Sequence, residues 1–206
     1  MTVARAIALL ACLSCAGVTP AAEPAHDHAA MAHDHAAPAG GPIIGTYSTA
    51  DLTFLTHMIV HHQQALELCA LVDERSPRAD FQRFSRYLND AQQAEIDQMK
   101  GLLTQAAARG ATISEPRFHD DPPMAGMLSK ARMAAIRNAT GSEFERLWLE
   151  GMILHHQGAV DMALAQQEAQ FRNRNQPFGL DTLVDEMLAV QRAEIGRMKG
   201  WLATWR

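Results

Sequence analysis

Hydrophobic residues follow a helical period in four long stretches of this chain. Apolar positions three and four residues apart give each stretch one buried stripe, as in helices that share a core. The pattern predicts helices over residues 48–74, 77–109, 142–172 and 180–205. A shorter accessory helix is predicted over 124–138, after a loop that contains three prolines.

Residues at the predicted helix starts support these boundaries. Ser48 and Asp51 have the spacing of a capping box, and so do Ser142 and Glu145. Ser76 precedes a proline, an order typical of an N-cap followed by the first helical residue. We therefore expect three of the four long helices to begin at these capping residues.

Two segments of the chain are repeated. The stretch FLTHMIVHHQQALELCALV, from Phe54, recurs 94 positions later as WLEGMILHHQGAVDMALAQ, from Trp148. QQAEIDQMKGLL at 92–103 likewise matches QRAEIGRMKGWL at 191–202. The domain at 48–206 thus reads as two copies of one helical hairpin, 48–110 and 142–205, joined by a linker and short helix at 111–141. One hairpin cannot bury its stripe alone, so the predicted fold class is an all-α four-helix bundle.

Each hairpin places polar groups in or beside its buried stripe. A helix turns about 100° per residue, and this angle puts one methionine and two histidines of the first helix near the core. The second helix contributes a glutamine, a glutamate and a methionine. The residues are Met58, His61, His62, Gln92, Glu95 and Met99 in the first hairpin, and Met152, His155, His156, Gln191, Glu194 and Met198 in the second.

The two buried glutamates need compensation, because an unpaired carboxylate in a dry core costs several kcal/mol. A histidine on a facing helix or a bound metal can supply it. A purely structural network of His–Glu hydrogen bonds is the simpler interpretation. The duplication of the set, together with its thioether sulfurs, favours a metal site that includes Glu95 and Glu194.

Ligand softness favours copper in this site. Methionine suits Cu(I), and histidine suits either oxidation state. Zinc is less favoured because it leaves the methionines unexplained. Carboxylate-bridged di-iron bundles use Glu-x-x-His on single helices, and none of the predicted helices contains that motif. We interpret Cys69 as a small core residue, and Met124, Met127 and Met133 as packing residues.

The N-terminal part of the chain has a different character. Residues 1–22 resemble a secretory signal, with a short apolar run and a small-residue exit. Cys12 and Cys15 lack a convincing lipoprotein context, so anchoring by a lipid is less favoured. Residues 23–47 form a polar tail for which we expect disorder and capture of Cu(II). The tail residues concerned are His26, His28, Met31, His33 and His35.

Composition narrows the partners. The 206 residues are 48% hydrophobic, enough for a core, and the formal charge of −5 gives no reason to expect nucleic acid. No apolar segment of about 20 residues is present, so no membrane span is expected. The signal predicts a periplasmic or secreted protein. Its expected partners are metal ions and a copper-donating or copper-accepting protein.

These motifs resemble a known family. MIVHHQQALELC and MILHHQGAVDMA, each followed by Q-x-x-E-I-x-x-M-x-x-x-L, are similar to the bacterial domain-of-unknown-function 305 family, over about residues 49–205. That family is ferritin-like and exported, and it includes periplasmic copper-binding proteins linked to copper resistance. The resemblance implies copper binding at Met58, His61, His62, Met99, Met152, His155, His156 and Met198.

The expected function is therefore copper sequestration or transfer without catalysis. Two alternatives stay open at this point. A ferritin-like oxidase, for instance one that oxidises Cu(I), would need a coordination position open to substrate or oxygen. A metal-free bundle that binds a partner protein would keep the histidines as structural residues. The sequence gives no oligomeric state.

Overall fold

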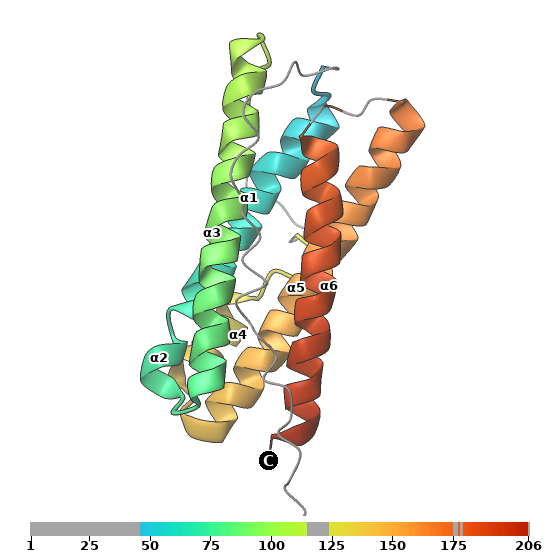
Figure 1. The fold of residues 1–206 in the computed structure, drawn as a ribbon. Coiled ribbons are helices and arrows are strands. Elements are labelled where there is room, and N and C mark those ends of the chain that lie inside the picture. The colour runs from blue at the N-terminus through green and yellow to red at the C-terminus, as the bar shows by residue number, and fades with distance from the viewer. Residues whose placement is uncertain (1–45, 115–123, 175–176, 178, 206) are drawn as a thin grey trace, which may run out of the picture. The chain divides into compact units, whose positions relative to one another are not determined.

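All secondary structure in the described residues is helical. The computed structural model describes residues 46–114, 124–174, 177 and 179–205. The chain divides into two units, Met1–His35 and Ala36–Arg206, and every described residue belongs to the second. The helices in this part are α1 (Thr49–Cys69), α2 (Val72–Arg75), α3 (Ala79–Ala108), α4 (Lys130–Asn138), α5 (Gly141–Asn173) and α6 (Leu180–Thr204). Figure 1 shows their arrangement.

The long helices pack in pairs that follow the sequence repeat. α1 lies against α3, α5 lies against α6, and the two pairs meet where α1 packs on α5. The short helices sit at the side, with α2 against α3 and α4 against α5. None of the helices in the described stretches is long and apolar enough to cross a membrane. The predicted signal and histidine tail lie outside the described residues.

The predicted stripes of α3 and α6 are buried. In α3 the helical period places Phe81, Phe84, Leu88, Gln92, Glu95, Ile96, Met99, Leu102, Leu103 and Ala106 on the stripe. All of these residues are buried except Leu103, which is half-buried. In α6, the stripe is buried from Leu180 to Met198, and only Trp201 and Leu202 at its end are half-buried. The 3.6-residue period therefore located the core correctly on both helices.

The first helix ends earlier than predicted, at Cys69 rather than near residue 74. Side chains from other helices donate hydrogen bonds to the carbonyl groups that would accept the next backbone hydrogen bonds of a longer helix. The Trp148 Nε1–H donates to Leu68 O at 2.8 Å, and the Ser85 hydroxyl donates to Cys69 O at 3.1 Å. The chain turns at Ala70 and resumes as the short helix α2.

Capping differs between the two hairpins. The predicted box at Ser48 is present, with the Ser48 hydroxyl accepting from Asp51 N and the Asp51 carboxylate accepting from Ser48 N. The predicted box at Ser142 is wrong, because α5 already begins at Gly141 and has no side-chain cap. Glu145 instead accepts from the Ser76 hydroxyl at 2.6 Å and pairs with the Arg78 guanidinium at 2.8 Å.

The accessory helix begins at Lys130 with Ser129 as its N-cap, not at Met124 as predicted. Residues 124–128, which we call the strap, cross α1 and α5 instead. Gln64 on α1 clamps the strap, because its side-chain amide accepts from Leu128 N at 2.7 Å and donates to Leu128 O at 3.0 Å. Gly126 has a φ of +77°, which helical residues do not adopt.

Gly158 on α5 makes the strap's course possible. A Cβ atom at this position would lie 2.1 Å from Ala125 O, far inside a van der Waals contact. Gly158 stands 94 positions after Gln64 and is its equivalent in the second copy of the repeat. The first copy therefore holds the strap through the Gln64 side chain, and the second copy leaves space for the strap at Gly158. The strap thus breaks the symmetry of the two hairpins.

We predict that Gly158→Ala lowers the free energy of unfolding by about 1–3 kcal/mol, the usual cost of overpacking. The new methyl group must push the strap away from α5. Gly196→Ala on α6 is the matched control: its Cβ meets nothing within 4 Å. It should raise the free energy by about 0.5–1 kcal/mol, because alanine suits a helix better than glycine. Denaturant unfolding measures both, and equal effects would contradict the clearance argument.

Candidate metal centre

The four predicted histidines form one buried row across the contact between α1 and α5. The rings of His61 and His155 lie face to face at a tilt of 38°, with their centroids 3.8 Å apart. His62 extends the row on α1 at 6.3 Å from His61, and His156 extends it on α5 at 6.1 Å from His155. None is more than 1% exposed. The repeat in the sequence therefore becomes a single cluster in space.

Each ring uses its Nε2 atom for a hydrogen bond. His62 pairs with the Glu95 carboxylate, and His156 pairs with the Glu194 carboxylate at 3.0 Å. The inner two rings bond to backbone carbonyls, His61 to Ala125 O and His155 to His61 O, both at 2.9 Å. A carbonyl or carboxylate oxygen can only accept, so the hydrogen sits on Nε2 of these rings.

The other ring nitrogen, Nδ1, is buried without a hydrogen-bond partner in all four histidines. Native proteins satisfy most buried polar atoms, so four orphaned nitrogens in one cluster require an explanation. In a neutral ring with hydrogen on Nε2, Nδ1 carries a free lone pair. Metal-binding histidines have this arrangement: one nitrogen faces the metal, and the other donates to a carboxylate or carbonyl. The cluster therefore fits a metal by its hydrogen bonding.

The pKa values of the inner histidines favour the uncharged ring. Burial, followed by the neighbouring His62, lowers the pKa of His61 to about 3. Burial and the surrounding histidines hold the pKa of His155 well below its ordinary value. Both rings are neutral near pH 7, so a metal would have no proton to displace from them.

The four predicted methionines line the same interior. Met58, Met99, Met152 and Met198 are all 0% exposed. Met58 and Met152 lie one helical turn before the histidine pairs on their own helices, where side chains are neighbours. Met99 and Met198 lie one turn after Glu95 and Glu194. The thioethers are thus within a helical turn of the nitrogen and oxygen groups of the cluster.

The described stretches contain no group of three or more His, Cys, Asp or Glu side chains that could hold a metal ion. The buried methionines bring sulfur to the same interior, and thioether sulfur selects soft ions such as Cu(I).

The two buried carboxylates have the histidine partners that the sequence allowed as one alternative. Glu95 on α3 and Glu194 on α6 are 7% and 5% exposed, and each pairs with the outer histidine of the facing helix. The same contact fixes the orientation of the ring, as outer carboxylates do for metal-bound histidines. The contact thus serves the structural interpretation and the metal interpretation equally.

Three features of the site were missed from sequence. Ala125 O accepts from His61, but no side-chain pattern could indicate a backbone contact. Gln64 clamps the strap, although its position in the helix gave no reason to select it. Burial, followed by the charges of Glu194 and Glu95, raises the pKa of Tyr87 to about 12. Residue 186, its equivalent in the second hairpin, is glutamate, so the repeat did not reveal Tyr87.

Cys69 is the small core residue that the sequence indicated. Its side chain is buried, and burial raises the pKa of the thiol to about 12. The thiolate, which is the form that binds metals, is therefore scarce at neutral pH. The tail residues predicted to capture Cu(II) lie outside the described part of the chain.

Comparison with known proteins identifies relatives of the fold. The family model of a domain of unknown function, DUF305, matches residues 51–202. A DUF305 fragment from Deinococcus radiodurans has 29% identity and a TM-score of 0.65, covering 77% of this chain and 98% of that one. A DUF305 protein of Streptomyces coelicolor, described as secreted, has 29% identity and a TM-score of 0.63, covering 75% and 91%. No curated protein matches the chain.

A third structure is that of CopM, solved with Cu(I), with Cu(II) and with silver bound. Its Cu(I)-bound form has 26% identity to this chain and a TM-score of 0.57, covering 75% of this chain and 96% of CopM. The all-helical fold is thus shared with a protein whose crystals contain soft metal ions.

The low pKa of His61 predicts that stability falls in acid. The unfolded chain takes up a proton near pH 6.5, whereas the folded ring resists it until about pH 3. The stabilising contribution is complete above pH 6.5 and is lost as the pH falls toward 3. The slope is about 1.4 kcal/mol per pH unit for each such histidine. Denaturant unfolding between pH 7 and pH 5 measures it, and His61→Gln should flatten the curve. An unchanged slope in that variant would contradict the buried neutral ring.

Proposed function

The chain belongs to the DUF305 family, and from this premise we propose that it is a copper-binding protein that sequesters Cu(I) or hands it on. One observation carries the proposal: four buried histidines leave Nδ1 free inside a methionine-lined interior. For the architecture, we propose a ferritin-like four-helix bundle over 48–206, made of two repeated hairpins. The cluster would lie where the hairpins meet.

In this proposal the ligands come from both halves of the chain. His61, His62, His155 and His156 would supply nitrogen, and Met58, Met99, Met152 and Met198 would supply sulfur. Glu95 and Glu194 would orient the outer rings or contribute an oxygen. The likeness to CopM, which has been solved with Cu(I), Cu(II) and silver bound, supports copper as the cargo. Zinc gives no role to the four sulfurs.

Binding without catalysis is favoured over the oxidase alternative by the kind of groups present. Ferritin-like oxidases hold their metals with several carboxylates and histidines on facing helices. In the described part of this chain each buried glutamate pairs with one histidine, Glu95 with His62 and Glu194 with His156. Storage or transfer needs only a site that binds and releases the ion.

The N-terminal region would set the location of the protein and add weak copper binding. The signal at 1–22 would direct the protein to the periplasm or outside the cell, in line with the relative described as secreted. The histidine tail at 23–47 would collect Cu(II) weakly. A copper-donating or copper-accepting protein would complete the route.

Replacing the four buried methionines with leucine tests the proposed site. Met→Leu keeps volume and hydrophobicity and usually costs less than about 1.5 kcal/mol, so the fold should survive. The combined variant of Met58, Met99, Met152 and Met198 loses all four sulfurs. Its Cu(I) affinity should fall by more than about 100-fold, since loss of an outer partner alone costs 10–100-fold. Competition with a colorimetric Cu(I) chelator gives the affinity.

The control is Met187→Leu, which removes an equally buried sulfur from the stripe of α6 at a distance of three turns from Met198. Its affinity for Cu(I) should stay unchanged. If the four-leucine variant folds and binds Cu(I) as tightly as the natural chain, the thioethers are core residues and the proposed site is wrong.

A further inference from the structure

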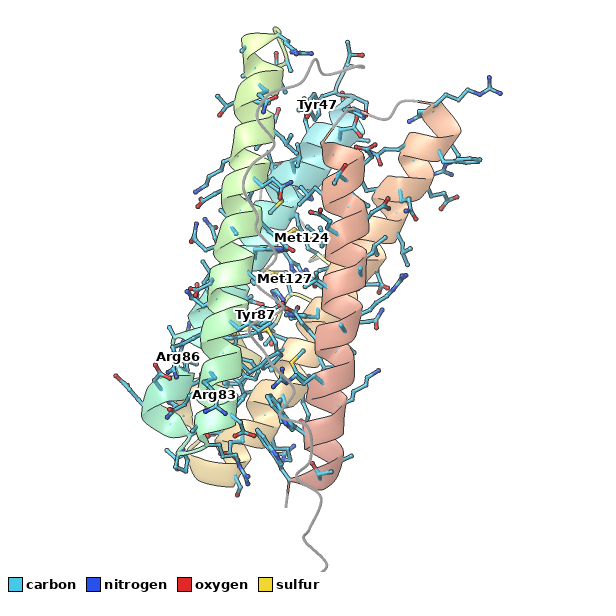
Figure 2. All side chains as sticks on the ribbon, viewed as in Figure 1. Tyr47, Arg83, Arg86, Tyr87, Met124 and Met127 are labelled. Atoms are coloured by element: carbon cyan, nitrogen blue, oxygen red, sulfur yellow. The ribbon has the colours of Figure 1, made fainter. Side chains whose placement is uncertain are left out.

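The strap carries two methionines on one tight turn. Met127 N donates to Met124 O at 3.1 Å, and Gly126 at the third position has a φ of +77°, as in a type II turn. The first and last residues of such a turn have Cα atoms within about 7 Å, so both thioethers can reach one ion. Figure 2 shows the two methionines next to each other on this segment.

Packing in the core accounts only in part for these two side chains. Met124 and Met127 are half-buried, whereas Leu128 is the apolar side chain that the strap buries. Methionine that serves as core filler is buried, as Met133 on the following helix is at 4% exposed. The two methionines of the strap therefore keep part of their surface accessible in the folded domain.

The strap is fixed beside the buried histidines. Ala125, which lies inside the methionine turn, accepts a hydrogen bond from His61 Nε2 at 2.9 Å. The two bonds from Gln64 hold the other end, and the close approach to Gly158 positions the middle. An ion bound by Met124 would be held by the residue next to Ala125, whose carbonyl oxygen is hydrogen-bonded to the His61 ring.

We propose that Met124 and Met127 form a second soft-metal site, which captures Cu(I) from solution and passes it to the buried cluster. Capture is ligand exchange, with no change of oxidation state. Holding the ion next to the cluster raises its local concentration there, which speeds loading without changing the final affinity. The passage step rests on the proposed function, whereas capture at the turn does not.

Methyl NMR of the full-length protein, with ¹³C-labelled methionine methyl groups and Ag(I) as a redox-inert probe, tests capture. The Met124 and Met127 methyl signals, assigned by single Met→Leu variants, should shift in the titration. The double variant Met124→Leu with Met127→Leu should bind one fewer Ag(I) ion. Unshifted Met124 and Met127 signals, or an unchanged number of bound ions, would overturn the proposal.

Stopped-flow loading with Cu(I) tests passage. The double variant should fill the buried cluster about tenfold more slowly, a change of ~1.4 kcal/mol in the barrier, and reach the same final affinity. Met133→Leu is the matched control and should load at the natural rate. An unchanged rate in the double variant would refute passage through the strap.

The two proposals fail separately. If the variant with leucine at the four buried methionines keeps its Cu(I) affinity, the proposed function is wrong. Capture at the strap still holds in that case if the Met124 and Met127 methyl signals shift with Ag(I). If the strap signals do not respond while that variant loses Cu(I), the buried site stands and the strap site is overturned.

Discussion

Four imidazole rings are buried in a dry interior, and they hold the long helices of the domain together. Each ring is tolerated there because its Nε2–H donates to an oxygen, two from carboxylates and two from backbone carbonyls. These bonds also tie the helices together. His62 joins α1 to α3, His156 joins α5 to α6, and His155 joins α5 to the backbone of α1. The cost of burying charge keeps His61 and His155 neutral and gives the interior its chemistry.

The same bonds leave the Nδ1 atom of each ring without a hydrogen-bond partner. A core selected only for stability would gain by satisfying these nitrogens or replacing them with apolar groups. Their persistence in both copies of the repeat, beside four buried sulfurs, is the physical reason for assigning a metal to the interior. The thioether groups of the buried methionines favour a soft ion.

Much of this arrangement could be predicted from the sequence because it depends on helical period and repetition. The stripe of α3, the pairing of Glu95 with a histidine and the burial of His61 all follow from spacing and the cost of an unpaired carboxylate. Contacts made by the backbone could not be predicted. The early end of α1 depends on Trp148 reaching a carbonyl from another helix.

The strap was mispredicted for a related reason. Residues 124–138 have helical composition, but Gln64 and the clearance at Gly158 hold the first part of this segment across two other helices. Such tertiary contacts override local propensity. Spacing alone suggested that Met124 and Met127 were packing residues, and the structure leaves both half-buried.

X-ray absorption spectroscopy of the full-length protein with one equivalent of Cu(I) tests whether the buried histidines and methionines bind copper together. The tightest-bound copper should have both nitrogen and sulfur neighbours, because histidine and thioether groups share the interior. A first shell of nitrogen and oxygen alone would contradict it. Copper would then bind without the buried methionines.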